Sequence, residues 1–307
     1  MIINTPVVIF VYNRKKETKI LIKKISKIKP KNIIFISDGP KDNDLDKRKC
    51  FEVENVIKNI NWKCKKRYIK SKKNIGLKKR ISTGLDKVFN LYDKAIILED
   101  DCIPNKSFFI FCEKFLKEYK DNYRIAGITG NNFQKQKIKE TFYYSKFSSI
   151  WGWATWRRVW KTYDIKIKFW HKFKNSQKWK IFFESNNERL LWEKIFDKVY
   201  NNQINSWAYS NLLCNWYYNR LTIVPKYNLI KNIGFTNSAT NTKKINKVYL
   251  PKVKNLKLDK VVYPKLIEPN IEADKFDFEN LYGGNSLKFP RNIYHKLVKI
   301  KKKYYRF

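Results

Sequence analysis

Three consecutive carboxylates, Glu99, Asp100 and Asp101, come directly after an apolar run of the chain. Neighbouring like charges carry an electrostatic cost that no structural need explains. A divalent cation removes that cost, and Mg²⁺ or Mn²⁺ prefers oxygen ligands of this kind. Such an ion would also bridge to a diphosphate and stabilise the charge that develops on a leaving nucleotide. We therefore predict a metal site here; the alternative is an acidic loop or a helix N-cap.

Two other side chains suit a bound nucleotide. Asp38, in Ser37-Asp38-Gly39-Pro40, could accept a hydrogen bond from the imide N–H of a uracil ring. Its alternative is an ordinary Asp-Gly turn. Arg14 begins a predicted helix and could offer a fork of donors to a phosphate. Its alternative is a solvated arginine at a helix start.

A third group of candidates opens another predicted helix. Asn74 and Gly76 precede that helix and Lys79 lies in its first turn, where a phosphate or a close backbone approach is possible. We assign all three to donor binding, together with Glu99 and Asp100. Lysine is so abundant in this chain that a single lysine carries little weight.

A hydroxyl that attacks as a nucleophile needs a base that removes its proton. Glu193 and Asp197 lie four residues apart, on one face of a predicted helix, and are our catalytic candidates. The alternative is an exposed helix face whose acids pair with lysines such as Lys194.

These residues depend on a repeating pattern of strands and helices in the first third of the chain. Apolar runs predict strands, and apolar residues at helical spacing between the runs predict helices. Strand and helix in alternation favour a mostly parallel sheet covered on both faces, with ligands beyond the carboxyl ends of the strands. The expected strands are 7–12, 33–36, 67–69 and 95–98, and the helices are centred on 20–28, 53–60 and 77–92.

The rest of the chain has a different texture. Residues 108–119 predict a helix and 125–128 a strand, whereas 141–224 are rich in Trp and Tyr and contain a long helical pattern over 179–199. We interpret this aromatic region as the acceptor-side half. Residues 250–290 show weak periodicity and are expected to wrap the core as extended chain.

Taken together, these segments resemble a known family. Their order and spacing are similar to the bacterial GT-A glycosyltransferases related to family 2, and to the N-acetylglucosaminyltransferase I family, whose metal motif is likewise EDD. The likeness covers about residues 5–242. The motifs that carry it are YNR (12–14), SDG (37–39), NIGL (74–77), ILEDD (97–101), GNN (130–132) and WGWATW (151–156).

The resemblance implies an α/β GT-A (nucleotide-diphospho-sugar transferase) fold, with a mostly parallel central sheet flanked by helices. It implies that Arg14 and Asp38 contact the nucleotide, that Asp100 contacts the ribose or the donor sugar, and that Asp101 binds the metal, Mn²⁺ or Mg²⁺. Trp151, Gly152 and Trp153 would line the acceptor side of the donor sugar. The donor would be a UDP-sugar, with N-acetylglucosamine as the first guess. The reaction would be an inverting transfer of the sugar, and the acceptor would be a glycan or a lipid-linked molecule.

Two positions depart from the family pattern. Ala208, in Ser206-Trp207-Ala208-Tyr209, stands where related sequences often have an acidic residue. Asn241, in Ala239-Thr240-Asn241-Thr242, stands where a histidine could add a metal ligand. Either these features are dispensable or this copy is impaired.

Composition leaves two rival functions open. The chain has 307 residues, with 67 Lys+Arg against 27 Asp+Glu and a formal net charge of +40, which attracts polyanions. Nucleic-acid binding is the rival from another class, but the basic residues are spread along the chain and no RRM, KH or zinc signature is present, so we expect no specific nucleic acid. A sugar nucleotidyltransferase is the enzymatic rival, yet the segment after the first strand, Tyr12-Asn13-Arg14-Lys15, lacks the glycines of a phosphate loop.

The charge and the cysteines bear on location. Five cysteines without metal-ligand spacing favour a reducing, cytoplasmic compartment, and we expect no signal peptide.

We divide the chain into a catalytic domain (1–242), an extended wrap (243–290) and a basic amphipathic tail (291–307). The tail has apolar residues at helical spacing among cations, which suits peripheral contact with the anionic inner face of a membrane. Packing of the same stripe on the catalytic domain is the alternative.

Overall fold

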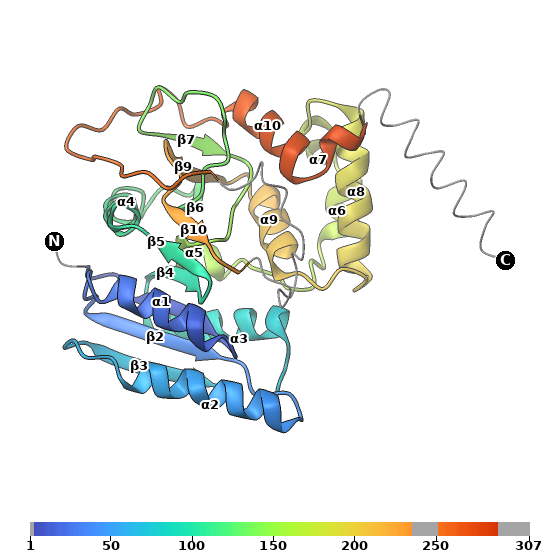
Figure 1. Cartoon of the computed structure of the whole chain (residues 1–307). Helices are drawn as coiled ribbons and strands as arrows, with labels where there is room; N and C mark the ends of the chain where they lie inside the picture. The colour runs from blue at the N-terminus through green and yellow to red at the C-terminus, as the bar shows by residue number, and fades with distance from the viewer. Residues whose placement is uncertain (1–2, 235–250, 288–307) are drawn as a thin grey trace.

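An eight-stranded sheet forms the centre of the computed structural model, which describes residues 3–234 and 251–287 (Figure 1). The first four strands of the sheet order are mutually parallel, β8 runs antiparallel to β4 and β6, β6 and β9 are parallel, and β7 is antiparallel to β9. The predicted mostly parallel α/β sheet is therefore confirmed. The strands, in sheet order, are β3 (Lys65–Lys70), β2 (Asn32–Ser37), β1 (Val7–Val11), β4 (Lys94–Glu99), β8 (Trp153–Trp156), β6 (Ile125–Thr129), β9 (Leu221–Pro225) and β7 (Phe142–Ser145).

Helices cover both faces of the sheet. On β1, Val7 and Ile9 belong to one hydrophobic core, and Val8 and Phe10 belong to another. This is the period of two that a strand buried on both faces requires. The first core includes residues of α1 (Lys15–Ile25), α2 (Asp44–Lys58) and α4 (Lys106–Glu118), and the second includes residues of α3 (Leu77–Leu91).

The aromatic region forms a third core. Its centre is a set of buried rings that includes Trp170, Trp179, Trp192 and Trp216. These rings come from short helices gathered at one side of the sheet (Figure 1). The helices are α6 (Trp170–Lys174), α7 (Gln177–Ile181), α8 (Asn186–Tyr200) and α9 (Trp207–Tyr217). α5 (Arg157–Trp160) lies instead against α3, with Trp160 in the second core.

The long helix predicted over 179–199 is wrong in one respect, because the structure divides it in two. α7 ends at Ile181 and α8 begins at Asn186. The hydroxyl oxygen of Ser185 accepts a hydrogen bond from the backbone N–H of Glu188, which is N-capping. The serine therefore starts a new helix where apolar spacing alone suggests continuity.

The last described segment combines extended chain with a helix that was not predicted. Residues 251–270 run without helices or named strands, and Val262 and Thr141 exchange hydrogen bonds there. α10 (Ile271–Leu281) and a 3₁₀ turn (Gly284–Leu287) follow. The wrap predicted for 243–290 is thus wrong over α10. Asn241 and the predicted tail lie outside the described residues.

A small two-stranded sheet lies beside the carboxylate triplet. β5 (Cys102–Pro104) pairs antiparallel with β10 (Ile230–Asn232).

All five cysteines are free thiols. Across the described ranges, no helix combines the length and the apolar character needed to cross a bilayer.

Candidate functional site

The residues predicted to bind the nucleotide and the metal meet at one edge of the sheet. β1 lies between β2 and β4, and all three strands point the same way. Their carboxyl ends therefore bring Arg14, Asp38 and the triplet from Glu99 to Asp101 to a common edge. This arrangement follows from the strand order and from the two short turns that end β1 and β4.

Arg14 joins two of the three acids. Its Nη1 atom lies 2.6 Å from Oδ2 of Asp101, and its Nη2 atom lies 3.0 Å from Oδ1 of Asp100. Arg14 is the N-cap residue of α1, so the helix start aims the guanidinium at the end of β4. The sequence predicted a phosphate contact for Arg14; the structure places it on carboxylates.

Burial and mutual repulsion make it costly for all three acids to be ionised together. Burial raises the pKa of Glu99 to about 8, and the charges of Asp101 and Asp100 add to this shift. Burial also raises the pKa of Asp100 to about 7, against the lowering effect of Arg14. The side chain of Asp100 is 2% exposed and its Oδ2 atom has no hydrogen-bond partner. A bare oxygen in a buried, acid-rich position fits a cation.

These residues alone do not complete a metal site. Within the described ranges, no group of three or more His, Cys, Asp or Glu side chains converges as a metal-binding set. Hard cations such as Mn²⁺ and Mg²⁺ commonly take their remaining ligands from water and from substrate phosphates. The carboxylates of Asp100 and Asp101 fit such a partial site.

Gly234 is a site residue that the sequence analysis missed. A Cβ atom built on Gly234 would overlap Oδ2 of Asp101 and would lie 2.7 Å from its Cγ. The preceding residue, Ile233, donates its backbone N–H to the carbonyl oxygen of Asp101 at 2.9 Å. The chain after β10 therefore lies directly against the acid, and only a residue without a side chain fits there. No local pattern marks this glycine, because its neighbour is 133 positions away in the chain.

Asp38 has a structural role within the site. Its carboxylate accepts hydrogen bonds from the backbone N–H groups of Gly39 (2.9 Å), Ile75 (3.0 Å) and Gly76 (2.8 Å). Both of its oxygens are used, so a uracil imide would have to compete with backbone donors. Asp38 thereby ties the loop after β2 to the loop after β3.

Asn74 extends this tie to the loop after β1. Its amide donates to the carbonyl oxygen of Gly39 at 2.8 Å and to the hydroxyl of Tyr12 at 3.0 Å. Tyr12 in turn donates to Asp46 at 2.6 Å, and Asn13 donates to the same carboxylate at 2.6 Å. Burial acts to raise the pKa of Asp46, but these hydrogen bonds outweigh it and lower that pKa. Tyr12 and Asp46 were not predicted.

Gly76 and Lys79 stand at the start of α3. Gly76 is the N-cap residue with φ +80°, a conformation that favours glycine, and a Cβ atom there would meet open space. Lys79 is exposed in the first turn of α3. Both remain at the edge where donor binding was expected.

The WGW segment lies beside this edge, but its two tryptophans differ. Trp153 begins β8, is 8% exposed and stacks on Trp207 with ring centroids 5.6 Å apart. Trp151 is half-buried and packs edge-to-face on Phe133. That Trp153 lines the acceptor side of the donor sugar stays a prediction, but the core covers its ring and leaves little of its face for a sugar. Trp151 keeps part of its surface open.

Gly152 forms the turn between them. Its φ is +80°, and a Cβ atom there would lie 2.7 Å from Cδ1 of Ile230 and 3.2 Å from Cδ2 of Leu98. Ile230 is the first residue of β10. The WGW turn and the carboxylate loop therefore pack against the same short strand.

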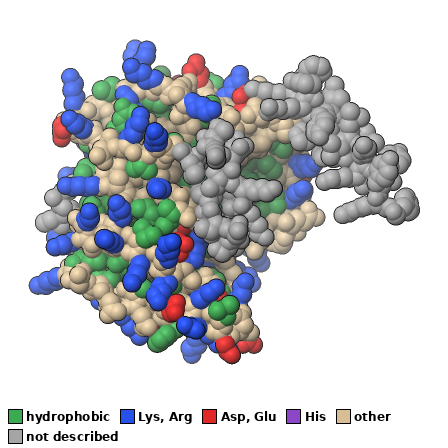
Figure 2. Space-filling model, in the orientation of Figure 1, with side chains coloured by type: hydrophobic (Ala, Val, Ile, Leu, Met, Phe, Trp, Pro, Cys, Tyr) green, Lys and Arg blue, Asp and Glu red, His purple; other side chains and the backbone are tan. Residues whose placement is uncertain are grey.

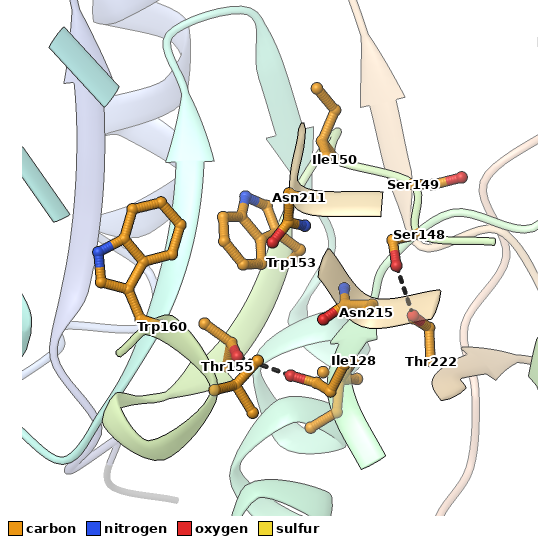
Figure 3. A pocket seen from close by; sticks show the side chains of 13 residues that line it. Ile128, Ser148, Ser149, Ile150, Trp153, Thr155, Trp160, Asn211, Asn215 and Thr222 are labelled. Carbon is orange, nitrogen blue, oxygen red and sulfur yellow. Dashed lines mark hydrogen bonds between the residues drawn. The ribbon is translucent and has the colours of Figure 1, made fainter. Parts of the chain in front are cut away.

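Behind Trp153 lies a small internal cavity (Figure 3). Its volume is about 20 Å³, which is room for about one water molecule and far too little for a sugar. Asn211 and Asn215 of α9 line it, and the hydroxyls of Ser148 and Thr222 bond to each other at its wall. It belongs to the packing of α9 on the sheet.

The two predicted catalytic acids are engaged elsewhere. Glu193 accepts a hydrogen bond from the indole N–H of Trp179 at 3.0 Å and pairs with Arg189. Asp197 accepts from the indole N–H of Trp170 at 2.9 Å and pairs with Lys174 at 2.8 Å. Both acids thus fasten α8 within the third core. This placement corrects the expectation that they face the cleft.

Comparison with known proteins gives one family match. The profile described as "Glycosyl transferase family 2" matches residues 7–199. No curated protein matches the chain.

Solved structures with a similar arrangement of strands and helices include two transferases and a pyrophosphorylase. TarS (residues 1–349) of S. aureus is 12% identical in sequence, with a TM-score of 0.38. The match covers 53% of this chain and 49% of TarS 1–349, so this chain spans about half the length of that protein. The mannosyltransferase PcManGT of Pyrobaculum calidifontis, in complex with GDP-Man and Mn²⁺, is 10% identical with TM-score 0.40, over 69% and 73%. An apo UDP-glucose pyrophosphorylase is 9% identical with TM-score 0.37, over 72% and 90%.

Proposed function

The chain belongs to glycosyltransferase family 2 and has the GT-A fold, and we propose that it transfers a sugar from a UDP-linked donor to a hydroxyl of a glycan or lipid-linked acceptor. The observation that carries this proposal is the cluster of Arg14, Asp100 and Asp101 at the carboxyl edge of β1 and β4. Ligands of open α/β sheets bind at that edge. N-acetylglucosamine as the donor sugar, and the likeness to the N-acetylglucosaminyltransferase I family, stay expectations.

In this proposal Asp101, with Asp100 beside it, holds the divalent cation. When bound, the cation would neutralise the diphosphate and stabilise the leaving nucleotide. The protein's own part is to fix the two carboxylates before the donor arrives. Ile233 and Gly234 do this from one side and Arg14 from the other.

The donor side is held by backbone and amide contacts. Asp38 and Asn74 join the loops after β2 and β3 through bonds to backbone groups, so both loops are ordered before binding. Gly76 and Lys79 then present a helix start and a cation to the donor phosphates. We assign Asp38 a positioning role in nucleotide binding.

The acceptor side is expected at Trp151, whose partly open ring can stack on a sugar. We assign no base to α8, because Glu193 and Asp197 are held by indoles and cations. Ala208, half-buried in the first turn of α9, supplies no carboxylate where relatives often have one.

A donor screen tests the function. Purified protein with Mn²⁺ is mixed with UDP-, GDP- and CMP-linked sugars, and nucleotide release is measured with and without chelator. We expect Mn²⁺-dependent UDP release from at least one UDP-sugar, unchanged in the surface variant Asp121→Asn, whose carboxylate is 84% exposed. Pyrophosphate release from UTP and a sugar 1-phosphate would instead identify a nucleotidyltransferase.

An oligonucleotide-binding assay run beside the donor screen tests the polyanion alternative. Lys and Arg are scattered over the face shown in Figure 2 and do not gather on one element. Tight, salt-sensitive oligonucleotide binding without any nucleotide-sugar binding would contradict the proposed transferase.

A further inference from the structure

We propose that Arg14 is an exchangeable counter-ion, which occupies Asp100 and Asp101 in the empty enzyme and must leave them for the donor phosphates when the metal binds. The inference rests on the proposed function, because it takes Asp101 as a metal ligand. Loss of a site residue usually weakens ligand binding. Here we expect the opposite for the metal: removing Arg14 should strengthen metal binding.

The geometry places the arginine on the oxygens that a cation needs. The guanidinium bonds two different carboxylates, with Nη1 on Oδ2 of Asp101 and Nη2 on Oδ1 of Asp100. It therefore spans the gap between the acids, as a bridging cation would. The other oxygen of Asp100, Oδ2, is buried without a partner.

Metal and arginine compete for both space and charge. A small divalent cation binds carboxylate oxygen at about 2.0–2.2 Å, a position that overlaps a donor already within hydrogen-bond distance of the same oxygen. Two cations on one pair of acids also repel each other, and more strongly where burial lowers the local dielectric. Asp101 is 13% exposed and Asp100 is 2% exposed, so solvent screens this repulsion poorly.

Arg14 can leave the two acids for a second partner, the donor phosphates. Its side chain is 27% exposed, so it reaches solvent at the open edge of the sheet. A guanidinium fork matches phosphate oxygens as well as it matches carboxylates. A diphosphate delivered to this edge would accept the fork that the metal displaces, and the exchange would couple the two binding events. Such coupling is reciprocal: the donor strengthens metal binding as much as the metal strengthens donor binding.

The test is a calorimetric titration of Mn²⁺ alone into wild type, Arg14→Gln and Arg14→Lys. We expect Arg14→Gln to bind Mn²⁺ about tenfold more tightly, equivalent to about 1.4 kcal/mol. Arg14→Lys keeps the charge but loses the fork, so its affinity should lie between the other two. A second titration, with UDP in saturating Mn²⁺, should show weaker UDP binding in Arg14→Gln than in wild type. Arg48→Gln, on a side chain that is 79% exposed on α2, is the matched control.

Thermal unfolding gives a readout that does not depend on activity. Removing Arg14 leaves two acids without their counter-ion, so Arg14→Gln should melt lower than wild type in chelator. Added Mn²⁺ should raise its Tm by more than it raises that of wild type, because tighter binding to the folded state stabilises it more.

The results of these titrations distinguish failure of the arginine exchange from failure of the proposed metal-dependent function. Unchanged or weaker Mn²⁺ binding in Arg14→Gln, with binding lost in Asp101→Asn, overturns the exchange and leaves the metal site standing. Wild-type Mn²⁺ binding in Asp101→Asn overturns both. If Arg14→Gln does not fold, the Arg14→Lys titration decides, and wild-type affinity in that variant contradicts the exchange.

Discussion

Asp101 is held from three directions by groups that come from distant parts of the chain. Arg14 contacts its carboxylate, Ile233 donates to its backbone carbonyl, and Gly234 leaves the room in which the carboxylate stands. Each contact limits a different movement of the acid. The contacts from Ile233 and Gly234 do not depend on Arg14, so they can hold the acid for the cation after the arginine has left.

Gly234 allows a direct test at this scale. Gly234→Ala should displace the Asp101 carboxylate and reduce Mn²⁺ affinity and donor turnover by about tenfold or more, the loss typical of misplaced metal ligands. The backbone of Gly234 is outside the left-handed region, so the substitution adds no backbone strain. The measurement is Mn²⁺ titration together with donor hydrolysis.

A second glycine is the control for that variant. Gly283 has φ +90° and open space around it, so Gly283→Ala is strained but clears its neighbours. It should lower stability slightly and leave Mn²⁺ binding intact. Equal loss of Mn²⁺ affinity in both variants would show a general effect of destabilisation and would refute the steric role of Gly234.

The two tryptophans of the WGW segment should respond differently to truncation. Trp153 is buried against Trp207, so Trp153→Ala should cost about 3–5 kcal/mol of unfolding free energy and reduce every activity together. Trp151→Ala should mainly raise the acceptor KM. Urea unfolding and a comparison of transfer with donor hydrolysis distinguish the two. Equal unfolding midpoints for both variants would contradict this assignment.

At the scale of elements, the strand order does most of the positioning. β1, β2 and β4 carry their loops to one edge, and the alternation of continuous apolar runs with helically spaced apolar residues made that sheet predictable from the sequence. The predicted edge therefore brought Arg14 and Asp101 together correctly. What could not be predicted is the neighbour of each residue across the fold, as Gly234 beside Asp101 shows.

The elements that were missed have physical reasons. β8 (Trp153–Trp156) resembles a sugar platform because it is aromatic, yet both of its edges pair with strands, β4 and β6, and all four of its residues are buried. α10 buries Asp274 and Asp277 among its four buried residues, so apolar spacing cannot reveal it. Polar residues at core positions defeat a method that depends on hydrophobic periodicity.

Those buried acids make the docking of α10 sensitive to pH. Burial raises the pKa of Asp277 to about 8, with the charge of Asp274 as the second cause. Burial raises the pKa of Asp274 to about 6, although hydrogen bonds from Ser145 and Lys146 oppose it. Other titratable groups near this pair are Lys146, Glu188, Tyr143 and Tyr282.

The sign follows from proton binding. Both acids return to an ordinary pKa near 3.8 on unfolding, so between pH 4 and pH 8 the folded protein holds more protons than the unfolded chain. Stability must therefore fall as pH rises through this range. We predict a higher Tm near pH 5 than near pH 8.

Asp277→Asn should flatten that profile. The amide stays neutral at every pH and can still accept the hydrogen bond from Gln134, which is 2.8 Å long in the wild type. Asp259→Asn, at an exposed carboxylate, should leave the profile unchanged. A Tm that rises from pH 5 to pH 8 in the wild type would refute the assignment.

For the molecule as a whole, the net charge of +40 raises the question of which part of the surface attracts anionic partners. Residues 288–307, outside the described ranges, contain eight Lys or Arg residues and no acid. We predict that truncation after Pro290 abolishes binding to anionic vesicles at low salt and spares donor hydrolysis in solution. Vesicle co-sedimentation measures this. Undiminished binding by the truncated protein would assign the attraction to the rest of the surface.

The central claim is that Asp101 binds a divalent cation on which sugar transfer depends. The measurement is Mn²⁺-dependent turnover of a UDP-sugar by wild type, Asp101→Asn and the surface control Asp121→Asn. We expect Asp101→Asn to lose turnover on the order of 100-fold, which is the effect of removing one preorganised electrostatic group, with folding intact and the control unaffected. Full turnover by Asp101→Asn, or undiminished wild-type turnover in excess chelator, would contradict it.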